Sequence, residues 1–113
     1  MLLRLDVEHV DDLTVISASG EIDAGTADQV GDAVSEAFHE GRRRVLLDFA
    51  HVTFIDSSGL GVLVRSHRQA EANGAVFAVV HPSPHTRKLI RVLGLDRLLS
   101  IFDSQEQAHA ALI

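Results

Sequence analysis

The sequence predicts an α/β domain whose β-sheet is of mixed direction. First, residues 3–7 and 13–18 each have the pattern of a strand, and Asp11 and Asp12 mark a turn between them, which predicts an N-terminal antiparallel hairpin. Second, helix and strand patterns alternate after this hairpin, and such strand–helix–strand units join parallel strands. Third, a length of 113 residues fits one domain. We therefore expect a single domain over residues 1–113, with its helices packed against the sheet.

The first half of the chain contains the hairpin, one helix and one buried strand. Residues 20–26 connect the hairpin to a helix that ends before Gly41. The apolar positions of this helix recur at helical spacing and are Ala27, Val30, Val34, Ala37 and Phe38. Residues 45–49 then form a buried strand with one polar interruption, Asp48. That carboxylate is either buried and paired or lies at the exposed end of the strand.

The second half continues the alternation of strands and helices. A short connection after residue 49 leads to a helix over residues 57–73, and residues 76–80 form another buried strand. A third helix follows, with Ser83 as its predicted N-cap and Pro84 as its first residue.

The last part of the chain adds a short strand and a terminal helix. The third helix ends at Gly94, and its inward-facing positions are expected to be Leu89, Ile90 and Leu93. After a short strand at residues 101–102, Ser104 and Gln107 form a capping box for a helix that runs through Leu112.

Composition and charge exclude several classes of function. The net charge is −6, so the chain lacks the excess of Lys and Arg that provides most of the affinity for nucleic acid. The one dense basic run, at residues 42–44, follows a predicted helix end, where positive charge complements the helix dipole. The absence of cysteine excludes disulfides and thiolate metal sites, and the seven histidines show no helical metal-binding spacing. We expect no nucleic-acid partner, no metal site and no cofactor.

The hydrophobic pattern is that of a water-soluble domain. Hydrophobic residues make up 46% of the chain, which suffices for a core without disulfides. No apolar run approaches the ~18–20 residues that cross a bilayer. The N-terminal residues are too quickly charged for a signal peptide. We expect a cytoplasmic protein without membrane contact, present as a monomer or a weak dimer.

The most informative segment is residues 54–62, where a strand pattern changes to a helix pattern. Asp56, Ser57 and Ser58 lie at this helix start, where side-chain oxygens accept hydrogen bonds from the first backbone N–H groups. Gly59 follows them and leaves the first turn almost bare, so that another molecule can approach closely. A hydroxyl at such a helix start suits a switch that works by adding a charged group to the side chain. The alternative is that the serines only cap the helix.

Three segments resemble the STAS domain, and in particular its bacterial anti-sigma factor antagonists. They are residues 20–27 (GEIDAGTA), 54–62 (FIDSSGLGV) and 92–95 (VLGL). The first two motifs together are fairly specific, whereas the third alone is weak. The resemblance covers nearly the whole chain in order and spacing, and it implies the STAS fold, a mixed sheet with packed helices.

The resemblance also implies a mechanism. In such a family the unphosphorylated antagonist binds an anti-sigma factor that is also a serine kinase, and so frees a sigma factor for transcription. The kinase then uses ATP to phosphorylate the serine that matches Ser57, the complex dissociates, and a serine phosphatase restores the active form. By this resemblance the partner-binding residues are Asp23, Asp56, Ser57, Ser58 and Gly59, and the protein is not an enzyme.

Other functions and purely structural roles remain open. The chain could be a non-catalytic STAS scaffold, or a small nucleotide- or anion-sensing module that uses residues 57–61. A hydrolase is not expected, because the Gly-x-Ser-x-Gly motif is absent, and the Gly-Lys-Ser/Thr ending of a P-loop is missing too. Ser58 also has a structural interpretation as a capping residue, and Asp23 as a loop aspartate that binds nearby N–H groups.

Overall fold

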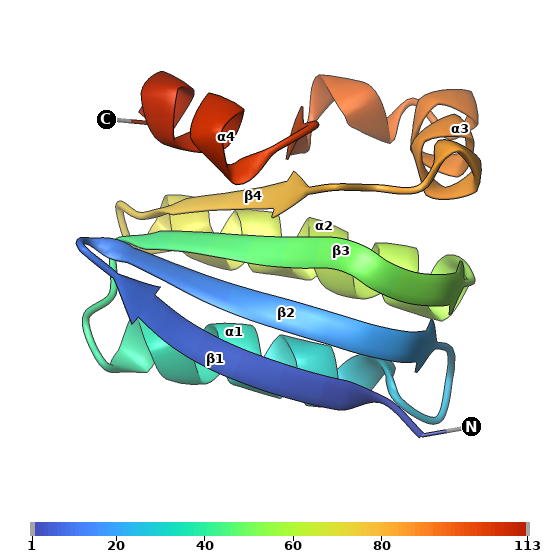
Figure 1. The fold of residues 1–113 in the computed structure, drawn as a ribbon, viewed down its shortest axis with the longest axis horizontal. Coiled ribbons are helices and arrows are strands. Elements are labelled where there is room, and N and C mark those ends of the chain that lie inside the picture. The colour runs from blue at the N-terminus through green and yellow to red at the C-terminus, as the bar shows by residue number, and fades with distance from the viewer. Residues whose placement is uncertain (1, 113) are drawn as a thin grey trace.

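A computed structural model describes residues 2–112, so Met1 and Ile113, the two ends of the predicted domain, lie outside the described residues. Within residues 2–112, five strands form one sheet in the order β1-β2-β3-β4-β5. The pair β1–β2 is antiparallel and the other neighbours are parallel, which confirms the predicted mixed sheet (Figure 1). The strands are β1 (Arg4–Val10), β2 (Leu13–Ile22), β3 (Arg44–Ile55), β4 (Val76–Val80) and β5 (Ser100–Phe102).

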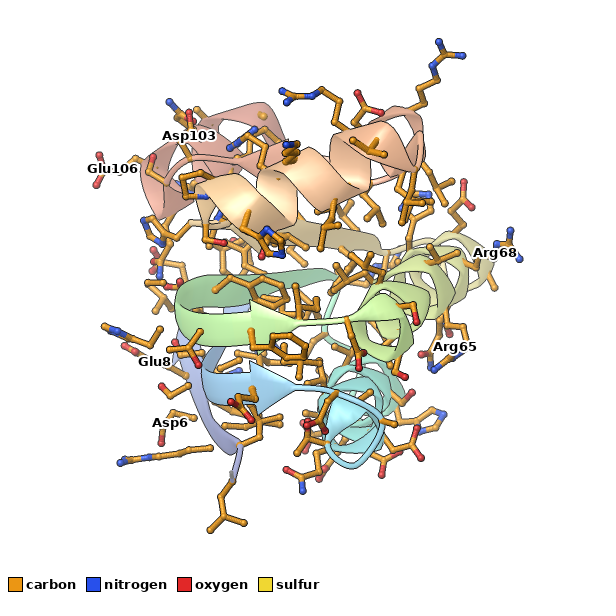
Figure 2. All side chains as sticks on the ribbon, turned by 90° about the vertical axis from the view of Figure 1, so that its right-hand side faces the viewer. Asp6, Glu8, Arg65, Arg68, Asp103 and Glu106 are labelled. Carbon is orange, nitrogen blue, oxygen red and sulfur yellow. The ribbon has the colours of Figure 1, made fainter. Side chains whose placement is uncertain are left out.

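The helices cover the two faces of the sheet unequally. They are α1 (Ala27–His39), α2 (Ser57–Ala72), α3 (Pro84–Val92) and α4 (Gln105–Leu112), with a short 3-10 turn η1 (Leu95–Arg97) before β5. Figure 2 shows α1 and α2 side by side on one face, whereas α4 lies on the other. Among the described residues, no helix has both the length and the apolar character needed to cross a membrane.

The main core lies between the sheet and the pair α1 and α2. It is built from the apolar positions of both helices and from alternate residues of the central strands, among them Ile16, Val34, Leu47, Leu63 and Val79. A smaller cluster lies under α4 on the opposite face and consists of Leu13, Val15, Leu46, Ala78, Val80 and Ala108. Burial on both faces explains why residues 45–49 of β3 and the whole of β4 are almost continuously apolar.

The strands β2 and β3 extend further than the sequence predicts. β2 was expected to end at residue 18 and β3 at residue 49, but they end at Ile22 and Ile55. The register with β2 shifts between Asp48 and His51 and again between Val52 and Phe54, and each time β3 carries one extra residue, so the period-2 alternation of β3 is interrupted there. Gly20 has φ +116°, and a side chain on it would lie 2.6 Å from the Leu2 carbonyl oxygen. These extensions place the β2–α1 and β3–α2 connections at one end of the sheet.

Two predicted helix ends are confirmed and share one backbone arrangement. Gly41 follows α1 with φ +85°, and Gly74 follows α2 with φ +63°. The N–H of Arg42 donates to the Ala37 carbonyl (3.0 Å), which is the 6→1 bond of a Schellman motif. The loop after α2 contains the equivalent bond. The last carbonyls of both helices are therefore satisfied by backbone N–H groups.

The third helix begins as predicted but differs at its end. Ser83 Oγ accepts a hydrogen bond from the Thr86 N–H (3.1 Å), and Pro84 is the first helical residue. The prediction that Leu93 faces inward is wrong, because its side chain is 57% exposed. The helix ends at Val92, and Gly94 turns the chain with φ +74°, so Leu93 falls outside the inward stripe.

The capping box of α4 is present in a shifted form. Ser104 Oγ accepts from the Gln107 N–H (3.1 Å), as predicted. The Gln107 side chain, however, accepts from the N–H of Asp103 (3.0 Å) and not from that of Ser104. The reciprocal bond thus reaches one residue further back, and it ties α4 to the end of β5.

Candidate functional site

Two connections that are far apart in the sequence meet where β2 and β3 end. The Asp56 N–H donates to the Ile22 carbonyl oxygen at 3.2 Å. Since Ile22 directly precedes Asp23 and Asp56 directly precedes Ser57, this bond brings the two predicted segments together. Figure 2 looks onto this end of the molecule, where the arrowheads of β2 and β3 point toward the side on which α1 and α2 lie.

Asp56, and neither serine, caps helix α2. Its backbone is extended, and its Oδ1 accepts hydrogen bonds from the N–H groups of Ser58 (2.8 Å) and Gly59 (3.4 Å). A cap of this kind contributes about 1 kcal/mol to stability. The alternative interpretation that the serines serve only as caps therefore loses its basis, because the carboxylate already performs this role.

Ser57 is the first residue of α2 and is exposed to solvent. Its hydroxyl has no hydrogen-bond partner within residues 2–112, since the neighbouring N–H groups bond to Asp56. Ser58 is half-buried in the same turn. The first serine hydroxyl is thus free to react with an external group.

Asp23 shapes the loop before α1. Its Oδ1 accepts from the Gly25 N–H (2.9 Å), and its backbone carbonyl accepts from the N–H groups of Thr26 (3.1 Å) and Ala27 (2.8 Å). The structural interpretation of this aspartate therefore holds. The side chain is only half-buried, so it also presents negative charge at the surface of the loop.

Thr26 is an organising residue that the sequence did not reveal. Its hydroxyl donates to the Glu21 carbonyl (2.8 Å) and accepts from the Asp23 N–H (3.0 Å), and the residue is buried. A threonine just before a helix is typical of an N-cap, yet Thr26 makes no cap hydrogen bond to α1. Its side chain bonds back into the loop and holds Asp23 in place.

Gly59 has a packing role inside the fold. A Cβ atom at this position would lie 2.5 Å from Ile55 Cγ1 and 2.8 Å from Ile22 Cγ2, and both isoleucines are buried. The glycine thus lets α2 approach the ends of β2 and β3 closely. This packing accounts for a glycine at this position without any partner, and partner contact at Gly59 stays a prediction.

The site is acidic and carries one exposed aromatic side chain. Residues 20–31 and 45–64 contain no Lys or Arg, whereas Glu21 lies near the end of β2 and Asp23 and Asp56 lie in the two connections. Phe54 pairs with Glu21 in the β2–β3 register, and 45% of its surface is exposed. The strand pattern alone did not single out this phenylalanine, because an apolar residue in an apolar strand is normally expected to be buried.

Asp48, whose environment the sequence left open, is paired. Its side chain is 12% exposed, and its Oδ1 lies 3.0 Å from His81 Nδ1 and accepts from the Ala50 N–H at 2.9 Å. Gln105 Nε2 of α4 donates to Oδ2 at 3.4 Å. Within residues 2–112, no three His, Asp or Glu side chains lie close enough together to hold a metal ion.

The fold and this site define a STAS domain. The family model of the STAS domain matches residues 4–108, and the chain belongs to that family. The anti-sigma F factor antagonist of Paenibacillus polymyxa is 29% identical over 113 residues, which cover 99% of this chain and 97% of that protein.

Solved structures of similar proteins show the same fold. An anti-sigma factor antagonist from Mycobacterium paratuberculosis has a TM-score of 0.89 and 29% identity, and the match covers 98% of this chain and 94% of that one. The phosphorylated form of the Bacillus cell fate determinant SpoIIAA has a TM-score of 0.74 and 27% identity, with coverage of 97% and 100%. The unphosphorylated form of this anti-sigma factor antagonist has a TM-score of 0.73 and 25% identity, with coverage of 96% for both chains.

Proposed function

We propose that this protein is an anti-sigma factor antagonist whose partner binding is controlled by phosphorylation of Ser57. The unphosphorylated form binds an anti-sigma factor that is also a serine kinase, and thereby frees a sigma factor for transcription. The kinase transfers the γ-phosphoryl group of ATP to the Ser57 hydroxyl, and the complex dissociates. A serine phosphatase restores the binding form. The protein acts in the cytoplasm as a regulator and not as an enzyme.

The observation that carries this proposal is the unbonded, exposed hydroxyl of Ser57. Asp56 takes the capping bonds at the start of α2, so the serine contributes nothing visible to the helix. A side chain without a structural role at an exposed helix start is available to a kinase. It is also available to a partner surface that reads whether a phosphate is present.

Charge explains how a phosphate on Ser57 would release the partner. The group adds about −1.5 to −2 charges to a region that already contains Asp23 and Asp56. Its local effect on the fold is small, because the helix dipole favours an anion while the two carboxylates oppose it. At an interface, by contrast, misplaced like charges cost several kcal/mol. A loss of ~3–4 kcal/mol weakens binding by a few hundredfold.

The proposed contact surface combines charge with an apolar side chain. It includes the predicted residues Asp23 and Asp56 in the two joined connections and Ser57, Ser58 and Gly59 in the first turn of α2. Phe54 lies beside them and adds exposed apolar area, which suits the aromatic anchors that dominate many interfaces. The phosphate would therefore be added at the border of an apolar anchor.

The comparison with SpoIIAA supports a switch that leaves the fold unchanged. The phosphorylated and unphosphorylated forms match this chain almost equally well, with TM-scores of 0.74 and 0.73. An anion-sensing function at residues 57–61 has less support. The N–H groups of Ser58 and Gly59, which an anion would need, already bond to Asp56.

The test is phosphorylation by anti-sigma factor kinases encoded in the same genome. After incubation with kinase and ATP, mass spectrometry should find one added phosphate, located on Ser57. The variant Ser57→Ala should gain no phosphate, whereas the matched control Ser58→Ala should be phosphorylated like the wild type. Phosphate on Ser58, or no binding to any of these kinases, would contradict the proposal.

A further inference from the structure

A basic pocket lies at the end of the sheet opposite Ser57. Its volume is about 480 Å³, and Arg42, Arg43 and Arg44 line it together with Asp12. It forms where the β1–β2 turn, the loops before β3 and β4, and the C-terminal turn of α4 meet. Figure 1 shows these four segments together at the left-hand end, while α1 and α2 begin at the right-hand end.

Arg42 is held rigidly at the wall of this pocket. Its Nε donates to the hydroxyl of Thr14 (2.6 Å), which is completely buried, and its Nη2 donates to the Leu13 carbonyl (3.2 Å). The guanidinium plane is thereby fixed before any ligand arrives. Such preorganisation lowers the entropy that binding would otherwise cost.

Arg43 and Arg44 are also anchored, each through a different segment. Arg43 Nη2 donates to the Gly74 carbonyl (3.0 Å) in the loop after α2, and Arg44 forms an ion pair with Asp12 in the β1–β2 turn. A guanidinium has five N–H donors, so each of these arginines keeps unused N–H groups that can bind a ligand. Within residues 2–112, one carboxylate faces three guanidinium groups in the lining of this pocket.

Helix capping does not account for this cluster. The sequence suggested that the basic run complements the dipole at the end of α1. In the structure, the last carbonyls of α1 accept from the N–H groups of Gly41 and Arg42, and those of α2 accept from the following loop. The arginine side chains bond instead to β2, to the α2–β4 loop and to the β1–β2 turn. The side chains of the cluster are therefore not needed to satisfy the last carbonyls of either helix, and they concentrate positive charge in a chain whose net charge is −6.

We propose that this pocket binds a phosphate group, either as inorganic phosphate or as part of a small phosphorylated molecule. Guanidinium groups match phosphate oxygens in geometry and charge and form strong, often bidentate hydrogen bonds. Three guanidiniums anchored on separate segments suit a tetrahedral group that presents several oxygens. Val76 and Leu112 also line the pocket and provide apolar surface beside the arginines for the rest of a larger molecule.

The site is independent of the switch proposed for Ser57. The two regions lie at opposite ends of β2 and β3, so a ligand in the basic pocket leaves Asp23 and Ser57 uncovered (Figure 1). Failure of either proposal therefore leaves the other standing.

The experiment is a titration followed by ¹H–¹⁵N NMR at low salt, with inorganic phosphate, AMP, glucose 6-phosphate and citrate as separate probes. Phosphate should shift the amide signals of residues 41–44 and 74–76 and leave those of residues 56–60 in place. Tighter binding of AMP or glucose 6-phosphate would identify a phosphorylated small molecule as the source. Equal or weaker binding of both would identify inorganic phosphate.

Charge-neutral variants make the test specific. Arg43→Gln should weaken phosphate binding at least about tenfold, because a hydrogen bond to a charged group is lost. Arg44→Gln should do the same. The matched control is Arg68→Gln, since Arg68 is an exposed arginine of α2 that does not line the pocket (Figure 2). The proposal is overturned if phosphate shifts none of these signals, if citrate binds as tightly, or if Arg68→Gln weakens binding as much as Arg43→Gln.

Discussion

The two ends of the sheet carry opposite charges, although both are built from connections between the same strands and helices. At one end, α1 and α2 begin, and the connections present Asp23, Asp56 and Ser57. At the other end the two helices finish, and the connections present the arginines at residues 42–44. The difference lies in how each end satisfies the backbone.

Where α2 begins, the Asp56 side chain performs the capping, and where α1 and α2 finish, the backbone does. The first N–H groups of α2 donate to the Asp56 carboxylate, and the Ser57 hydroxyl is left without a hydrogen-bond partner within residues 2–112. Gly41 and Gly74 let loop N–H groups bond the last carbonyls, and this leaves the neighbouring arginines free for other contacts. A side chain becomes available for function when a neighbour has already satisfied the helix end beside it.

The largest expected effect is on partner binding at the acidic end. Ser57→Asp should weaken binding to the kinase by about 2–3 kcal/mol, that is roughly 30- to 150-fold, because it adds a like charge to the proposed interface. Isothermal titration calorimetry would measure the loss. The control Ser57→Ala removes the hydroxyl without adding charge and should bind nearly as the wild type does. A Ser57→Asp variant that is unfolded, or that binds undiminished, would remove charge as the basis of the switch.

A smaller effect, on stability, is expected at the packing contact behind this site. Gly59→Ala should lower the free energy of unfolding by about 2 kcal/mol, because the new methyl group collides with the buried Ile22 and Ile55. Gly61 provides the matched control in the same helix, since its Cβ would meet only the flexible end of Arg65, at 3.3 Å. Gly61→Ala should stabilise the helix by about 0.5–1 kcal/mol. Urea denaturation would measure both, and equal effects would show that packing does not select glycine at position 59.

The smallest effect is expected at the opposite end, where the backbone makes the cap. Gly41→Ala should cost about 1 kcal/mol, because φ +85° is unfavourable for any residue with a Cβ, and nothing else lies within 4 Å. The comparison variant Gly25→Ala tests a loop glycine at the acidic end whose φ is not in the left-handed region. Thermal unfolding should show a lower Tm for Gly41→Ala alone. If both variants melted alike, the conformation of Gly41 would not be what ends α1.

Much of the fold follows from local patterns in the sequence. The strand β4 has the predicted bounds, and α2 begins at the predicted Ser57, because an apolar run and a polar helix start are both local signals. The far half of β3 was missed because bulges after Asp48 and after Val52 interrupt the alternation. Leu93 was misplaced because helical spacing does not show where a helix stops contacting the core.

The sequence predicted which kinds of side chain form the candidate site, but not how these side chains are arranged in space. The motif around Ser57 indicated a helix start with free oxygens, and the resemblance to the STAS family indicated which serine to consider. The sequence did not show that Thr26 holds the Asp23 loop or that Phe54 is exposed beside it. Both facts depend on contacts between β2, β3 and the loop that follows β2.

By itself, the sequence determined the order of the elements, the positions of most helix ends and the kinds of side chain near each end. Only the tertiary structure decided which of these side chains are free. The Asp56 N–H bonds to Ile22, and Arg42 bonds to Thr14, 28 residues earlier in the chain. Hydrogen-bond and packing partners so far apart in the sequence leave no local pattern, because they meet only when the sheet has brought its strands together.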